Sequence, residues 1–162
     1  MGMDIKTLAR STIEELFDSG RTSRLSDVSQ LSYVGHDPLS SKSISLDDTM
    51  ELARSFRTGF PDLRCTVNDT VTEGERVVCR WRMSGTHQGP FLGIAPTGKK
   101  VSFDGISEMR FYQGRLAEQW TMYDCLGLLH QLGLLPSFED MSAARIEAEE
   151  ARKRELLPSR PT

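Results

Sequence analysis

VSFDGISEMRFYQGRLAEQWTMYDC, residues 101–125, contains two runs of alternating polar and apolar side chains on either side of YQG, residues 112–114. This pattern is typical of two antiparallel strands joined by a tight turn. Successive side chains of a strand point to opposite faces of the sheet, so Gln119, Thr121 and Tyr123 are expected to share one face. Glu118 and Asp124, the carboxylates of the second strand, are then expected on the other face.

The length of the turn decides which residues of the first strand accompany Thr121, because a shift of one residue exchanges the two faces completely. A three-residue turn places Thr121 with Phe103, Gly105, Ser107 and Met109. A turn of two or four residues places it with Asp104, Ile106 and Glu108. The first arrangement keeps apolar side chains together, and the second supplies a carboxylate beside Thr121. Both remain open from the sequence.

The rest of the chain predicts helices before strands. Apolar residues at helical spacing indicate a helix over residues 4–18, with Asp4 as its N-cap, and a second helix runs from Ser45 to about Gly59. Residues 64–74 and 75–89 read as two further strands, and residues 126–136 as a short apolar helix. This order is typical of the α+β class, with helices on one face of a curved, mainly antiparallel sheet. We expect one domain over residues 1–140 and a charged helical or flexible tail over residues 141–162.

Composition excludes several classes of protein. A formal net charge of -3 argues against broad binding of nucleic acid, which usually needs a basic face. No apolar run approaches the roughly 20 residues of a membrane span, and the first residues do not resemble a signal peptide. The three cysteines are far apart and indicate reduced thiols in a cytoplasmic protein. The three histidines lack the spacing of metal ligands, so no metal site is expected.

Three segments carry a resemblance to a known family: FPDLRCTVNDTVTEGERVV (residues 60–78), GTHQGPFLGIAPTGKKVSFDGISEMRFYQGRLAEQW (85–120) and DCLGLLHQLGLLP (124–136). Together they resemble the SnoaL-like polyketide cyclases of the nuclear-transport-factor-2-like superfamily. The resemblance implies a cone-shaped α+β barrel with its N-terminal helices on the concave face of the sheet. It also implies a deep hydrophobic pocket, a homo-oligomer (dimer or tetramer) and chemistry without a bound metal or coenzyme.

The chain departs from the family where the family places its catalytic aspartate. The family pattern E-H-W-D is here Glu118-Gln119-Trp120-Thr121, so threonine replaces the acid that moves the proton during ring closure. An alcohol is too weak a base to replace a carboxylate near neutral pH. Asp104 is our first candidate for a substitute acid or base, and His87, which titrates near neutral pH, is the second. Asp104 can equally be a surface residue, and His87 a structural loop histidine.

Thr121 is then expected to orient substrate oxygens within the catalytic site. Aromatic and methionine side chains on adjacent strands can form ordinary core or line an apolar pocket. The predicted substrate-binding residues are Gln119, Tyr123, Trp81, Met83, Phe91, Phe103 and Trp120.

By resemblance, the chain is expected to be a tailoring enzyme of aromatic polyketide biosynthesis, for a compound of the anthracycline type. The lost aspartate leaves two reactions open, ring hydroxylation and an altered aldol-type cyclisation. Hydroxylation would use O2, with help from a partner reductase. A third alternative is a binding or dimerisation domain without catalysis, because one fold serves many functions.

Overall fold

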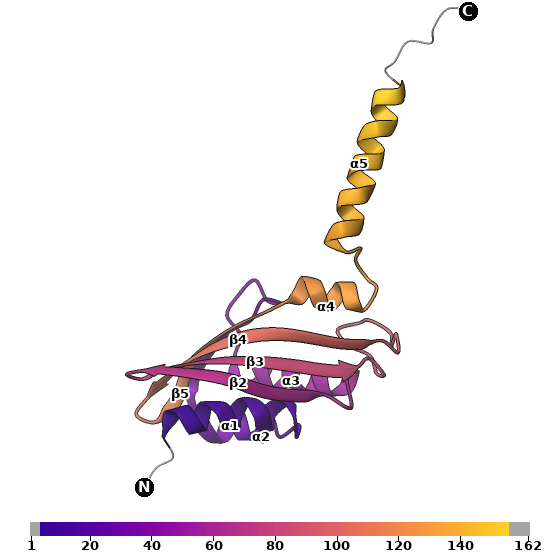
Figure 1. Ribbon diagram of the computed structural model, residues 1–162. Coiled ribbons are helices and arrows are strands. Elements are labelled where there is room, and N and C mark those ends of the chain that lie inside the picture. Colours follow the sequence, from indigo (N-terminus) through magenta and orange to yellow (C-terminus); the bar gives the residue numbers. More distant parts are fainter. Residues whose placement is uncertain (1–3, 156–162) are drawn as a thin grey trace, which may run out of the picture.

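The computed structural model describes residues 4–155, in which helices cover one face of a five-stranded sheet and a last helix leaves the body (Figure 1). In chain order the elements are α1 (Ile5–Phe17), α2 (Ser23–Val28), β1 (Ser29–His36), α3 (Leu46–Gly59), β2 (Arg64–Glu73), β3 (Arg76–Thr86), β4 (Lys100–Tyr112), β5 (Arg115–Tyr123), α4 (Cys125–Gln131) and α5 (Phe138–Glu155).

The sheet has the order β1-β5-β4-β3-β2. Strands β2 to β5 form an antiparallel meander, and β1 pairs in parallel with β5 at the edge. Helices α1 and α3 lie on the inner face, where α1 packs mainly against β2 and α3 against β1. Their buried side chains, which include Ile13, Leu16 and Phe56, meet the apolar inner face of the sheet. The α+β class predicted from the sequence is therefore confirmed.

Both long helices of this layer begin at the predicted caps. The Asp4 carboxylate accepts hydrogen bonds from the backbone N–H groups of Lys6 and Thr7. Ser45 and Asp48 form a reciprocal capping box at the start of α3. These side chains bind backbone donors that have no partner within the first helical turn, so they fix where each helix starts.

A two-residue turn and a bulge together set the register of β4 and β5. Gln113 and Gly114 form the turn, with positive φ angles of 51° and 75°. The pairs nearest the turn are regular, but Arg110 pairs with Glu118, which leaves Ala117 as an extra residue in β5. Such a bulge shifts all later pairs by one residue.

The shift determines the inner face of the sheet. Beyond the bulge Ser107 lies opposite Thr121, and Gly105 lies opposite Tyr123. The side chains that accompany Thr121 are therefore those of the apolar alternative, although the turn has two residues. Asp104 points to the other face, because neighbouring positions of a strand alternate.

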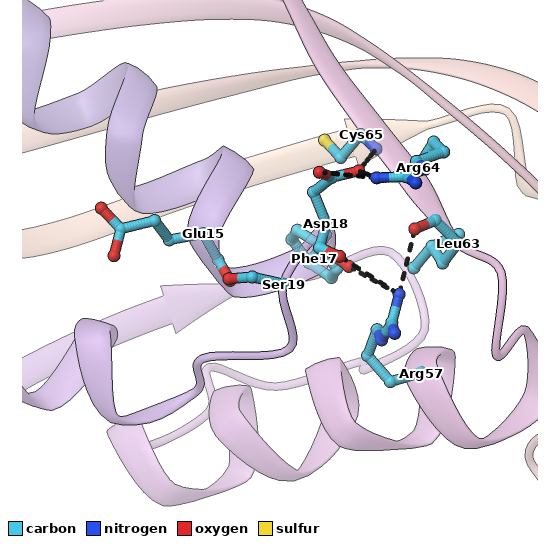
Figure 2. Close-up of polar contacts among 8 residues, drawn as sticks. All are labelled: Glu15, Phe17, Asp18, Ser19, Arg57, Leu63, Arg64 and Cys65. Atoms are coloured by element: carbon cyan, nitrogen blue, oxygen red, sulfur yellow. Dashed lines mark hydrogen bonds and ion pairs between the residues drawn. The ribbon is translucent and has the colours of Figure 1, made fainter.

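Arg57 of α3 joins the helical layer to the start of β2 (Figure 2). Its Nη1 atom donates to the backbone carbonyls of Phe17 (3.5 Å), Asp18 (3.3 Å) and Leu63 (3.0 Å). The Asp18 carboxylate in turn accepts a hydrogen bond from the backbone N–H of Cys65 (3.4 Å). One guanidinium thus provides hydrogen-bond donors for backbone carbonyls at the end of α1 and just before β2, where regular backbone pairing stops.

The C-terminal part lies outside the helical layer. Gln131 of α4 exchanges two hydrogen bonds with the backbone of Ser102, which holds α4 beside β4. Helix α5 extends away from the sheet, and its residues 138–154 are all exposed (Figure 1). The helix begins at Phe138, and the predicted division at residue 140 stays a prediction. Residues 156–162 of the predicted tail lie outside the described residues. Among the helices of residues 4–155, none is long and apolar enough to cross a membrane.

We predict that Arg57→Met lowers the free energy of unfolding by about 1.5–3 kcal/mol, because three carbonyls lose a charged donor. Arg54→Met is the matched control, since Arg54 lies on the same helix and, within the described part of the chain, pairs only with the exposed Glu51. We expect the control to change the free energy by no more than about 0.5 kcal/mol. Urea unfolding of the three proteins measures both values, and equal effects of the two substitutions would contradict the role of Arg57.

Candidate active site

A cavity lies between the helical layer and the inner face of β3, β4 and β5. Its enclosed volume is about 30 Å3, and a volume of about 500 Å3 is reached only when the open space at the mouth is counted. Side chains of α1, α3 and the segment after β1 form the apolar walls: Leu16, Phe17, Ile44, Leu52, Ala53 and Phe56. Polar groups are few and gather on the sheet side, as is typical of small-molecule sites.

Three hydrogen bonds connect the polar side chains at the floor of this cavity. Trp81 Nε1 donates to Ser107 Oγ (3.0 Å), the hydroxyls of Ser107 and Thr121 are 3.2 Å apart, and Gln119 Nε2 donates to Thr121 Oγ1 (2.9 Å). Gly105 makes the first of these possible, because a Cβ at that position would collide with the Trp81 indole. The floor is therefore a fixed row of hydrogen-bonding groups.

The floor holds more donor hydrogens than its three hydrogen bonds use. Trp81 and Gln119 supply one N–H each, and the bond between Ser107 and Thr121 needs only one of their two hydroxyl hydrogens. The remaining hydroxyl hydrogen has no acceptor within the row. It is available to an oxygen atom that enters the cavity, and a carbonyl or phenolic oxygen is a suitable acceptor.

The carboxylate of Asp37 lines the cavity near the phenol side chains of Tyr123 and Tyr33. Asp37 follows the last residue of β1, and its Oδ1 accepts hydrogen bonds from the Leu39 N–H (2.9 Å) and the Tyr123 hydroxyl (3.3 Å). Burial raises the pKa of Asp37 above its usual range. Burial also raises the pKa of Tyr123, which stays a neutral donor near pH 7. The Tyr33 hydroxyl is buried without a hydrogen-bond partner among the described residues, and burial raises its pKa to about 12.

Other charged groups near the site belong to the outer face of the sheet. His36 lines the cavity, but its ring stacks on Trp120 with centroids 5.0 Å apart, and its Nε2 lies 2.9 Å from Glu118 Oε1. Arg110 donates to the second oxygen of Glu118 (2.8 Å), and this bond holds the pKa of the carboxyl below its ordinary value. Glu118 and Trp120 thus lie on the outer face of the sheet, behind the cavity. Within residues 4–155 no group of three potential ligands suits a metal ion.

The model of the SnoaL-like polyketide cyclase family matches residues 7–132, which is most of the chain. The chain belongs to the SnoaL-like polyketide cyclase family. Membership supports a role in polyketide tailoring in general terms, and it confirms the resemblance seen in the sequence. A search of curated proteins found no significant match.

Solved structures of the same fold agree with this membership. AclR from Streptomyces galilaeus, a candidate hydroxylase, is 26% identical, covers 94% of this chain and 97% of its own, and superposes with a TM-score of 0.75. TsrD from Streptomyces laurentii is 27% identical, with coverage of 83% and 100% and a TM-score of 0.71. IdmH from Streptomyces antibioticus, a candidate polyketide cyclase, is 29% identical, with coverage of 78% and 96% and a TM-score of 0.66.

In this SnoaL-like chain the cavity brings together five of the residues singled out from the sequence, namely Trp81, Met83, Gln119, Thr121 and Tyr123. Three other predicted substrate contacts do not line it. Phe103 lies behind the wall against Trp81 and Tyr123, and Phe91 packs on Phe56 and Phe60. Trp120 is on the outer face, in keeping with strand alternation.

Asp104, our first candidate acid or base, points away from the cavity of this SnoaL-like fold. Its carboxylate accepts two hydrogen bonds from Arg82, of 2.7 and 2.9 Å, and its side chain is 55% exposed. The Arg82 hydrogen bonds hold the pKa of Asp104 below its ordinary value. An ion-paired carboxylate on the outer face cannot reach a proton of a molecule bound in the cavity. The position of Asp104 is therefore not compatible with a role as acid or base in this cavity.

His87, the second candidate, is buried in the loop between β3 and β4 and does not line the cavity. Its Nδ1 accepts a hydrogen bond from the Thr97 N–H (3.2 Å), and its ring packs between Phe60 and Phe91. Nε2 is buried without a partner among the described residues. Burial lowers the pKa of His87, so the ring is neutral and acts as a structural element of the loop.

Sequence reasoning missed Asp37 and the role of Ser107. Asp37 belongs to the segment GHDP, residues 35–38, which reads as an ordinary turn. Its position depends on the parallel pairing of β1 with β5, a contact between segments more than 80 residues apart in the chain. The sequence offers one indication of Asp37 as a site residue, a carboxylate directly after a strand, and that indication alone is weak.

We predict that the free energy of unfolding falls as the pH drops below about 6.5, because the unfolded chain protonates His87 while the folded chain does not. The slope reaches at most about 1.4 kcal/mol per pH unit and ends once the pH is below the lowered pKa of the folded state. His87→Asn keeps an acceptor for the Thr97 N–H and cannot titrate. Urea unfolding between pH 7.5 and 5 is expected to give a shallower slope for this variant, and identical slopes would exclude His87 as the source.

Proposed function

We propose that the chain is a tailoring enzyme that hydroxylates a polycyclic aromatic polyketide held in the cavity. The observation that carries this proposal is the hydroxyl pair of Ser107 and Thr121, 3.2 Å apart, at the position where the family's ring closure uses an aspartate. A hydroxyl pair donates a hydrogen bond and cannot hold a negative charge near neutral pH. It therefore suits a substrate oxygen that must be positioned and stabilised.

The walls support a flat, mainly apolar ligand. Aromatic and aliphatic side chains surround the space, as is typical of small-molecule sites, although the enclosed volume of about 30 Å3 is smaller than a ring system. We propose that a carbonyl or phenolic oxygen of the substrate accepts the spare hydroxyl hydrogen at the floor. Because the enclosed part is narrow, side chains of the apolar wall must move when a ring system enters.

The proposed reaction starts from a ring that a separate reductase has reduced from the quinone by two electrons and two protons. The reduced ring reacts with O2, so that one oxygen atom enters the ring as a hydroxyl group and the other leaves as water. The quinone form is restored, which balances the electrons. AclR, the candidate hydroxylase that matches nearly the whole chain, supports this choice of reaction. The chain's share is to bind, orient and shield the ring, with no coenzyme of its own.

An altered aldol cyclisation is the second candidate, because IdmH and the family as a whole are associated with ring closure. That reaction needs a base for a carbon acid, and Thr121 cannot supply it. A cytoplasmic location and a homo-oligomer belong to the same proposal; the first rests on the three separate cysteines and the second on the resemblance. A binding domain without catalysis would bind the polyketide and return it unchanged.

We predict that the full-length chain, supplied with hydroxyanthraquinones, a quinone reductase and NADPH, forms a product that is one oxygen atom heavier. Mass spectrometry under 18O2 checks the source of the oxygen, because an atom from O2 adds 18 mass units and an atom from water adds 16. An isomeric or dehydrated product would indicate cyclisation instead. If every hydroxyanthraquinone were recovered unchanged, the hypothesis of an enzyme would be excluded and that of a binding domain would remain.

We also predict that Thr121→Val lowers kcat/KM by about 10-fold or more, since the Gln119 N–H loses its acceptor and the substrate loses its donor. The substitution keeps the shape of the side chain. Thr66→Val, an exposed position on β2, is the matched control and should retain the activity of the unaltered protein. Equal activity of the two variants would remove Thr121 from the site.

A further inference from the structure

We propose that Asp37 is the proton acceptor of this cavity, in place of the carboxylate that β5 lacks. The inference rests on the proposed function for its substrate class, an aromatic polyketide with a carbonyl or phenol group. It holds for either reaction of that substrate, because hydroxylation and ring closure both begin with the loss of a proton.

The parallel pairing of β1 and β5 places Asp37 next to the site. Gly35 pairs with Gln119 and His36 with Trp120, so Asp37 emerges one step further, beside Thr121. Strand alternation puts Asp37 on the same face as Gly35, which is the inner face. Asp37 and Thr121 both line the cavity, and among residues 4–155 Asp37 is the single carboxylate that does so.

The two oxygens of Asp37 have different surroundings. Oδ1 accepts both hydrogen bonds, from the Leu39 N–H and the Tyr123 hydroxyl, which fix the orientation of the group. Oδ2 accepts none from the part of the chain that the structure describes. No cation of those residues lies within 4 Å, whereas Asp104 and Glu118 each pair with an arginine. One oxygen is therefore anchored and the other is free to accept a proton.

The titratable groups around Asp37 do not neutralise it. Tyr123 on β5 and Tyr33 on β1 are phenols that stay protonated, and the Cys125 thiol lies nearby at the start of α4. His36 is turned toward Glu118 on the outer face. Asp48 of α3, across the shallow pocket that it shares with Asp37, is a second negative charge. Partial burial beside neutral and negative groups strengthens a carboxylate as a base.

The proposed step is a proton transfer that balances without a further reagent. Oδ2 of Asp37 takes a proton from the carbon next to a carbonyl group, or from a phenol. The electron pair of the broken bond moves onto the substrate oxygen as an enolate or phenolate. That oxygen accepts a hydrogen bond from the spare hydroxyl of the Ser107 and Thr121 pair, which stabilises the negative charge that develops there while the hydroxyl keeps its proton.

Exchange of hydrogen for deuterium at C1 of 2-tetralone in D2O tests the step without O2 or a reductant. Proton NMR measures the rate for the unaltered full-length chain, Asp37→Asn and the control Asp104→Asn. We expect the unaltered chain and the control to accelerate exchange equally, and Asp37→Asn to lose about 10²-fold or more of the acceleration. Line broadening of 2-tetralone verifies that each protein binds the probe.

A second variant covers the case in which Asp37→Asn fails to fold. Tyr123→Phe removes a hydrogen bond that lowers the pKa of Asp37, so the pKa of Asp37 is expected to rise. The pH below which the exchange rate falls should then move to a higher value. A carboxylate with only a structural role would leave this pH unchanged.

The outcomes separate the two proposals. Exchange that Asp37→Asn retains at full rate, or a bound probe that the unaltered chain does not exchange, would overturn the assignment of Asp37. Exchange that depends on Asp37 without any incorporation of 18O supports the assignment and removes hydroxylation. Incorporation of 18O by Asp37→Asn at the unaltered rate removes the assignment and keeps hydroxylation.

Discussion

The register between β4 and β5 is the constraint on which the rest of the structure depends. A single extra residue, Ala117, decides which side chains of β5 share the inner face with those of β4. Without it Gln119 would lie opposite Glu108 and Thr121 opposite Ile106, so the polar residues of β5 would share a face with the outer residues of β4. The apolar residues of β3 and β4 outnumber the polar ones on the observed inner face, so burial selects this register and the bulge reconciles it with a two-residue turn.

The helical layer makes the sheet face into a cavity. Helix α3 is tied to the end of α1 and to the approach of β2 by Arg57, and the long loop after β3 is tied to the end of α3 through the Gly59 carbonyl. Gly89 is required at this second junction, because a Cβ there would collide with the carbonyl of Thr58. These contacts hold the apolar wall at a fixed distance from the polar floor. The shape of the cavity therefore depends on contacts with the backbone that lie away from the polar side chains of the floor.

Local signals in the sequence predicted most of the elements. The caps at Asp4 and Ser45, the end of α3 near Gly59 and the alternation of β5 all follow from interactions within a few residues, which is why they are confirmed. The choice between Phe103 and Asp104 did not follow, because it depends on a bulge with no distinctive residue. Asp37 was missed for a related reason. Its role depends on a pairing between distant strands, and no local pattern reports such a pairing.

The hydroxyl pair at the cavity floor has one property that a carboxylate lacks. The bond between Ser107 and Thr121 can run in either direction, and each direction leaves the spare hydrogen on a different oxygen. Two rotations of light atoms thus move the donor by about the 3.2 Å between these oxygens while every heavy atom stays in place. The same floor can therefore donate a hydrogen bond to an acceptor at either of two neighbouring positions without any rearrangement of the protein.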